Sequence, residues 1–136
     1  MEKFFFEKNV AQLYKYAYFC AMYRTIIAYG HYYNEFLETL NEKEKLKFKY
    51  ILLLLETSDR VPIKFIRYIR DGLYELRVEY NGNIYRVFFC FDEGYVVILF
   101  NGFQKKTQKT LESEIRKAIN LKNEYYASKQ SSNNEH

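Results

Sequence analysis

The segment 74–100 constrains the fold of this chain most, because residues 74–80 alternate between apolar and charged side chains and two strand-like apolar runs follow at 84–91 and 95–100. Such alternation is typical of strands with one buried face. Asn81-Gly82 and Glu93-Gly94 interrupt the pattern, and both dipeptides suit the tight turns of β-hairpins. We therefore predict a three-stranded antiparallel meander with strands at 74–80, 84–91 and 95–100.

Helical patterns precede and follow this meander. The segments 34–40 and 41–55 carry apolar residues at helical spacing, and Asn41 with Glu44 resembles a capping box. A C-terminal helix is predicted from near Thr110 to about Tyr126, and a short strand at 23–29. The expected fold class is α+β, with an N-terminal helical hairpin packed on a mainly antiparallel sheet and a C-terminal helix.

Two terminal segments are expected to lie outside the domain, which spans 22–126. Residues 9–21 have helical spacing, but Met22 also looks like a domain start. Residues 1–21 are therefore either a helical extension or a segment that is not native to the domain. Residues 127–136 are polar and lack apolar anchors, so we predict a disordered tail.

Composition excludes several function classes. The 21 basic and 17 acidic residues give a net charge of +4, a mild excess that suits a polyanionic partner. No uncharged run approaches the ~20 residues of a membrane span, and charges interrupt any signal peptide, so a cytoplasmic protein is expected. Cys20, Cys90 and His31 have no zinc-site spacing, and we expect no metal, no cofactor and reduced thiols.

Each arm of the first hairpin carries an arginine among apolar residues, namely Arg77 and Arg86. If Asn81-Gly82 forms a two-residue type I′ turn, Arg77 faces Arg86. If Glu93-Gly94 forms the next turn, Arg86 faces Asn101. Like charges that face each other destabilise a sheet by up to ~1 kcal/mol, so such a row makes sense beneath a bound anion.

The remaining apolar residues of the meander would then share the opposite face and bury against the helices. They are Leu76, Val78, Val87, Phe89, Val96, Ile98 and Phe100. The run QKKTQK follows the third strand and would add Lys105, Lys106 and Lys109 to the anion site, which suits a phosphodiester. In the alternative register, a turn at Gly82-Asn83, Arg86 faces Glu79 and the charges are ordinary surface residues.

The segment DGLYELRVEYNGNIYRVFFCFDEGYVVILFNGFQKKTQKT resembles the RelE/HigB-type toxins of bacterial toxin–antitoxin pairs, in particular the phage-derived HigB-like branch. The pieces DGLYELR, YRVFF, GFQKKTQKT and EIRKA occur in the family's order, and NEFLETLNEKEKLKFKYILLLLE resembles its helical hairpin. The resemblance covers roughly 22–126. It implies a small barrel-like α+β domain with helices on one face of a curved sheet. The short strand at 23–29 joins the edge of this sheet.

The resemblance also implies an activity and partners. The activity is endoribonuclease cleavage of messenger RNA, usually in the ribosomal A site, by metal-independent attack of the 2′-hydroxyl. The partner is a cognate antitoxin, often with a helix-turn-helix. Two alternatives stay open, a ParE-like gyrase-inhibiting toxin and a non-catalytic remnant that binds antitoxin or nucleic acid.

Catalytic positions carry over only where the motifs match. Arg77 matches the basic position of the ELR motif, which implies a role near the 2′-hydroxyl. Arg86 matches the arginine of the YR motif and would contact the scissile phosphate, and Lys106 would stabilise the leaving 5′-oxygen. Lys105, Lys109 and Asn101 would bind RNA.

The sequence departs from the family at one catalytic position. Some RelE-type enzymes place a tyrosine near the start of the final helix, and residues 107–117 contain none. Tyr125 and Tyr126 could substitute for it or could be ordinary core aromatics.

Overall fold

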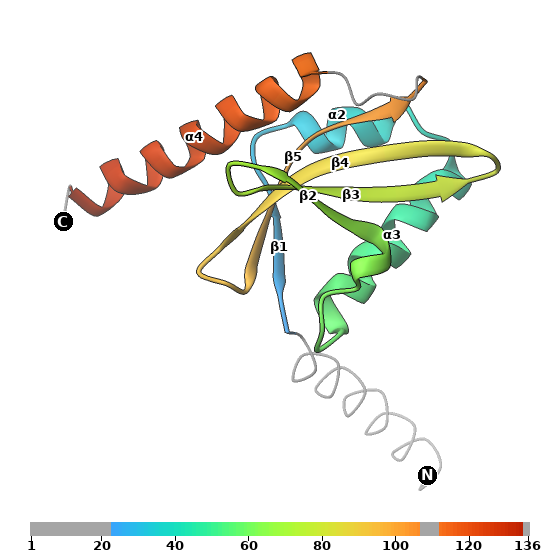
Figure 1. The fold of residues 1–136 in the computed structure, drawn as a ribbon, viewed down its shortest axis with the longest axis horizontal. Helices are drawn as coiled ribbons and strands as arrows, with labels where there is room; N and C mark the ends of the chain where they lie inside the picture. Colours follow the sequence, from blue (N-terminus) through green and yellow to red (C-terminus); the bar gives the residue numbers. More distant parts are fainter. Residues whose placement is uncertain (1–22, 107–111, 135–136) are drawn as a thin grey trace, which may run out of the picture.

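The computed structural model describes residues 23–106 and 112–134, and Figure 1 shows how the elements are arranged. The elements are β1 (Thr25–Ala28), α2 (Tyr32–Glu38), α3 (Glu42–Thr57), the 3-10 turn η1 (Ile63–Phe65), β2 (Ile66–Arg70), β3 (Leu73–Tyr80), β4 (Asn83–Asp92), β5 (Val96–Lys105) and α4 (Glu112–Asn134). This arrangement confirms the predicted α+β class with a C-terminal helix. The predicted helical pattern at 9–21 lies outside the described residues.

The five strands form one mixed sheet in the order β1-β5-β4-β3-β2. β1 pairs with β5 in parallel, and the other neighbours pair antiparallel. The strand expected at 23–29 is therefore present as an edge strand. β2 was not predicted, although the Asp71-Gly72 dipeptide that joins it to β3 is a hairpin signal.

The first hairpin has the register of a two-residue turn at Asn81-Gly82, one of the two registers that the sequence left open. Asn81 and Gly82 both have positive φ, 53° and 82°, as a type I′ turn requires. Tyr80 pairs with Asn83, and Arg77 consequently pairs with Arg86 across the β3–β4 ladder. The alternative register, with Arg86 opposite Glu79, is wrong.

The register predicted for the second hairpin is also wrong. Asp92 pairs with Val96, so the connecting loop has three residues rather than two. A β-bulge between Val87 and Phe89 then shifts the ladder once more, and Arg86 pairs with Phe103 instead of Asn101.

The longer loop also changes which side chains of β5 share a face, because a one-residue shift moves a whole strand's side chains to the other face. Ile98 and Phe100 pack in a cluster with α4 residues, whereas Leu76 and Phe89 pack in a cluster with α2 and α3 residues. The predicted common face for all seven apolar residues is therefore wrong for the β5 residues.

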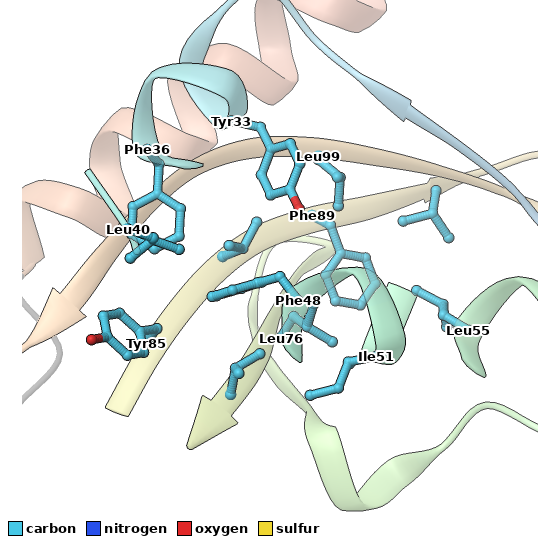
Figure 2. Close-up of a cluster of buried hydrophobic side chains, with 13 residues drawn as sticks. Tyr33, Phe36, Leu40, Phe48, Ile51, Leu55, Leu76, Tyr85, Phe89 and Leu99 are labelled. Carbon is cyan, nitrogen blue, oxygen red and sulfur yellow. The ribbon is translucent and has the colours of Figure 1, made fainter. Parts of the chain in front are cut away.

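Both faces of the sheet are covered, not one as expected. The first cluster lies between the sheet and α2 and α3, and Figure 2 shows its rings, including Phe36, Phe48 and Tyr85. The α3 helix begins with the predicted capping box, in which Asn41 and Glu44 exchange hydrogen bonds of 2.9 Å. Gly102 leaves room for this packing, since a Cβ built there would lie 2.6 Å from the Phe36 ring.

The second cluster lies between the other face and α4, which contributes Ile115, Ala118 and Leu121. This helix continues to Asn134, whereas the sequence predicted a disordered tail from residue 127. Lys129 has a partner on the sheet, because its Nζ lies 2.8 Å from Asp92 Oδ2. No helix within 23–106 or 112–134 is long and apolar enough to cross a membrane.

Candidate functional site

Four neighbouring strands each contribute a cation to one region of the face of the sheet that α4 partly covers. Paired residues share a face, and so do residues two apart on a strand. Arg77 pairs with Arg86, Arg67 pairs with Glu75, and Lys105 pairs with Ile84, which is two residues from Arg86. We call this group the cationic cluster; its members are Arg67, Arg77, Arg86 and Lys105.

Arg86 lies at the base of the cluster and is buried. Its side chain is 2% exposed, and its Nη1 donates to Oε1 of Glu75, which is 1% exposed. A charged group at this depth requires a partner of opposite charge. The Glu75 carboxylate is that partner, so the two side chains form a buried ion pair beneath the exposed cations.

Arg77 is the most accessible of the predicted catalytic arginines. Its side chain is 46% exposed, and its Nη2 lies 2.6 Å from Oε1 of Glu79, which is 63% exposed. An ion pair between exposed side chains contributes no more than ~1 kcal/mol. Arg77 can therefore exchange this carboxylate for another anion at little cost.

Lys105 is half-buried at the end of β5. Burial, and then the charges of Arg86 and Arg77, hold the pKa of its ammonium below the ordinary lysine value. A bound anion would counter this repulsion. Lys106 follows directly and is exposed, and Lys109 lies outside the described residues.

Asn101 is not part of the cationic cluster, and the predicted row of Arg77, Arg86 and Asn101 is wrong. Its side chain is 3% exposed, and its Nδ2 donates to the backbone oxygen and to Oε2 of Glu114, at 3.2 and 2.9 Å. Asn101 thus ties β5 to the first turns of α4.

Tyr125 and Tyr126 lie at the opposite end of β4 from the cluster. The Tyr125 hydroxyl donates to Asp92 Oδ2 at 2.5 Å, and the Tyr126 hydroxyl donates to the Phe91 oxygen at 2.8 Å. Asp92 is six residues from Arg86 along the strand, or about 20 Å. Burial, followed by the hydrogen bond to Asp92, raises the pKa of Tyr125 to about 12. Both tyrosines therefore anchor α4 to the end of β4 that lies away from the cationic cluster.

Two members of this site were missed from the sequence. Arg67 was missed because its strand was missed, and Glu75 was not identified as a site residue. The Asp71-Gly72 turn signal would have revealed the strand of Arg67, but the pairing of Arg67 with Glu75 also requires the register shift between Tyr68 and Arg70. Within the described segments, no group of three or more His, Cys, Asp or Glu side chains could hold a metal ion.

The arrangement can hold an anion over a positively charged surface. The four cations lie near two carboxylates, Glu75 and Glu79, so the group as a whole carries an excess of positive charge. Arginine and lysine groups arranged this way bind phosphates and stabilise negative charge that develops during a reaction.

Comparison with known proteins identifies a family. No curated protein matches the chain. The model of the family described as phage-derived protein Gp49-like (DUF891) matches residues 35–123, which include β2 to β5 and much of α4. The chain therefore belongs to the Gp49-like family, a RelE-like toxin family of toxin–antitoxin systems.

Proposed function

We propose that this protein is the toxin of a type II toxin–antitoxin pair, of the HigB-like branch, and that it cleaves messenger RNA during translation. Membership of the Gp49-like family supports a toxin-type function. The observation that carries the cleavage proposal is the convergence of exposed Arg67, Arg77 and half-buried Lys105 around the buried pair of Arg86 and Glu75.

The proposed reaction uses a nucleophile that the RNA itself supplies. The 2′-oxygen attacks the adjacent phosphorus, the bond to the 5′-oxygen breaks, and the products are a 2′,3′-cyclic phosphate and a 5′-hydroxyl. The 2′-hydroxyl loses its proton and the leaving 5′-oxygen gains one. The protein is then required to orient the phosphodiester and to stabilise the charge on its oxygens, which fixed cations do well.

The exposure of each cation suggests how the roles divide. Arg77 is open to solvent and is the proposed contact for the phosphate and the 2′-hydroxyl region. Lys105 is the last residue of β5, and Lys106 follows it. We assign Lys105 to the phosphate and Lys106 to the leaving oxygen. Lys109 keeps its proposed RNA contact, whereas the proposed contact of Asn101 has lost its geometric basis, because its amide is bound to α4.

Burial changes the role that we propose for Arg86. A side chain that is 2% exposed does not reach a phosphate on the surface. Its charge still acts on the site, because electrostatic interactions are strong where water is excluded. We therefore propose that Arg86 supplies positive potential from beneath, and that Glu75 holds it there.

The remaining parts of the proposal concern the partners of the protein and its cellular compartment. The antitoxin is proposed to be of the helix-turn-helix type and to cover the cationic cluster, the substrate to be messenger RNA on the ribosome, and the compartment to be the cytoplasm. A gyrase-inhibiting toxin would not need this cationic cluster.

The test is induced expression followed by primer extension on a translated message. We expect growth arrest and breaks within codons for the wild type. Arg77→Ala with Lys105→Ala should lower cleavage by about 10²-fold or more, as the loss of a transition-state donor does. Lys43→Ala, an exposed lysine of α3, is the control. A loss under tenfold in the double variant would remove the cationic cluster from the chemistry, and arrest without breaks would favour the gyrase alternative.

A further inference from the structure

A hollow opens at the free edge of β3, next to the cationic cluster. The β2–β3 ladder ends where Ile66 pairs with Leu76, so β3 continues beyond its partner strand. The hollow has a volume of about 330 Å³ and is lined by Lys47 from α3, Lys64 and Phe65 from η1, and Arg77 and Glu79 from β3. This volume suits a small ligand or a part of a larger one.

The lining of this hollow has an excess of positive charge. Three cations face one carboxylate, and Arg77 already binds that carboxylate. Among the described residues, neither Lys47 nor Lys64 has an ion pair with an acidic side chain. The two lysines are therefore available to an anion from outside the chain.

Phe65 gives the hollow an aromatic wall. Its side chain is half-buried and packs against the core below, while Lys64 Nζ lies 5.6 Å from the ring centroid. Aromatic rings beside lysines and arginines are the usual equipment of sites for single-stranded nucleic acids, because the ring stacks on a base and the cations bind the backbone.

Arg77 belongs both to the hollow and to the cationic cluster. An RNA strand whose phosphate contacts Arg77 would therefore place its next nucleotide in the hollow. An acidic peptide could use the same lysines, but it would not need a ring for stacking or continuity with a phosphate site. The lining thus favours RNA.

We propose that this hollow is a second RNA subsite, which binds a nucleotide adjacent to the one held at the cationic cluster. Lys47 and Lys64 bind its phosphate, and its unpaired base packs on Phe65. The subsite rests on the proposed function, since it extends the path of the same substrate. It gives the protein affinity for single-stranded RNA beyond the cleaved dinucleotide.

The experiment measures binding rather than cleavage. The probes are fluorescein-labelled, 2′-O-methylated oligonucleotides of two and six nucleotides, which lack the attacking hydroxyl, and affinity is read by anisotropy at low salt. The test variant is Lys47→Ala with Lys64→Ala. The control is Lys43→Ala with Lys49→Ala, two exposed lysines of α3 that do not line this hollow and whose loss removes the same charge.

We expect the wild type and the control to bind the hexanucleotide more tightly than the dinucleotide, and the test variant to lose this gain. The slope of log affinity against log salt should fall by about 0.7 for each lost phosphate contact. Phe65→Leu should weaken the hexanucleotide about fivefold or more and leave the dinucleotide unchanged. Its thermal unfolding, measured in parallel, shows that the variant is folded.

Equal hexanucleotide affinities in the test variant and the control would overturn the subsite and leave the proposed function standing. The same holds if the test variant loses affinity only for poly-L-glutamate, the probe for an acidic peptide. If the variants change oligonucleotide affinity as expected but the wild type does not cleave translated messages, the proposed function alone would be overturned. Absence of any hexanucleotide binding by the wild type would overturn the subsite, whereas the proposed function is judged by the primer extension.

Discussion

Replacing the buried pair of Glu75 and Arg86 together should cost less stability than replacing either residue alone. The side chains are 1% and 2% exposed, so water screens their interaction weakly. Glu75→Leu leaves a buried guanidinium without this partner, and Arg86→Met leaves a buried carboxylate. The double variant leaves neither charge and keeps a similar volume of side chain.

The expected magnitudes follow from this burial. Removing one partner of a buried ion pair costs about 3–5 kcal/mol, whereas exchanging the whole pair for apolar residues is often neutral. If the two losses were additive, the double variant would lose about 6–10 kcal/mol of unfolding free energy, which approaches the total stability of a domain. We expect the double variant to lose less free energy of unfolding than either single variant instead, with a coupling energy of several kcal/mol.

Equilibrium urea unfolding of the four proteins measures the coupling, since a domain of this size commonly unfolds in one cooperative step. The exposed pair of Arg77 and Glu79 provides the matched control, with 46% and 63% exposed side chains. Arg77→Met and Glu79→Leu should couple by no more than ~1 kcal/mol. Additivity of the Glu75 and Arg86 variants within about 0.5 kcal/mol would refute the reasoning.

Three further predictions follow from other contacts. Gly102→Ala should destabilise by about 1–3 kcal/mol, because its methyl group would collide with the Phe36 ring; an unchanged urea midpoint would contradict this. RNA affinity should fall with rising pH before an ordinary lysine deprotonates near 10.4, because the pKa of Lys105 is lowered, and Lys105→Arg should move that fall to higher pH. Hydrogen bonds, led by that of Lys129, lower the pKa of Asp92, so its contribution is present above the unfolded value near 3.9 and is lost in more acidic solution. Asp92→Asn should therefore flatten the decline of unfolding free energy below about pH 4, and parallel profiles would exclude the contribution.

The predictable part of the sheet is the part that a turn dipeptide fixes locally. Asn81-Gly82 has one favoured geometry, and that geometry alone is enough to place Arg77 opposite Arg86. The second hairpin has a weaker local determinant, because Glu93-Gly94 is not among the dipeptides that strongly favour a type I′ turn. Its three-residue loop and the bulge after Val87 depend on how β5 packs against α2 and α4, including the close approach at Gly102.

In the site, too, the features set by a local turn were predictable and those set by packing were not. The facing of Arg77 and Arg86 was predictable, because it depends only on the first turn. The burial of Arg86 was not, because it depends on packing around neighbouring strands, where Phe88 stacks on Phe103 with ring centroids 5.6 Å apart. Lys129 shows the same limit in the helix, since its Asp92 partner lies 37 residues away in the chain.

The two facing arginines do not by themselves show that an anion binds. Their repulsion was the reason to expect one, but Glu75 neutralises Arg86 from within the sheet and removes much of that repulsion. The charge that is open to an outside anion lies elsewhere, on exposed Arg67, on Arg77, whose partner Glu79 is itself exposed, and on Lys105, whose pKa is lowered partly by its neighbours. The case for a phosphate therefore depends on these outer cations. It follows that variants of Arg77 and Lys105 test function, whereas a variant of Arg86 tests function and stability together.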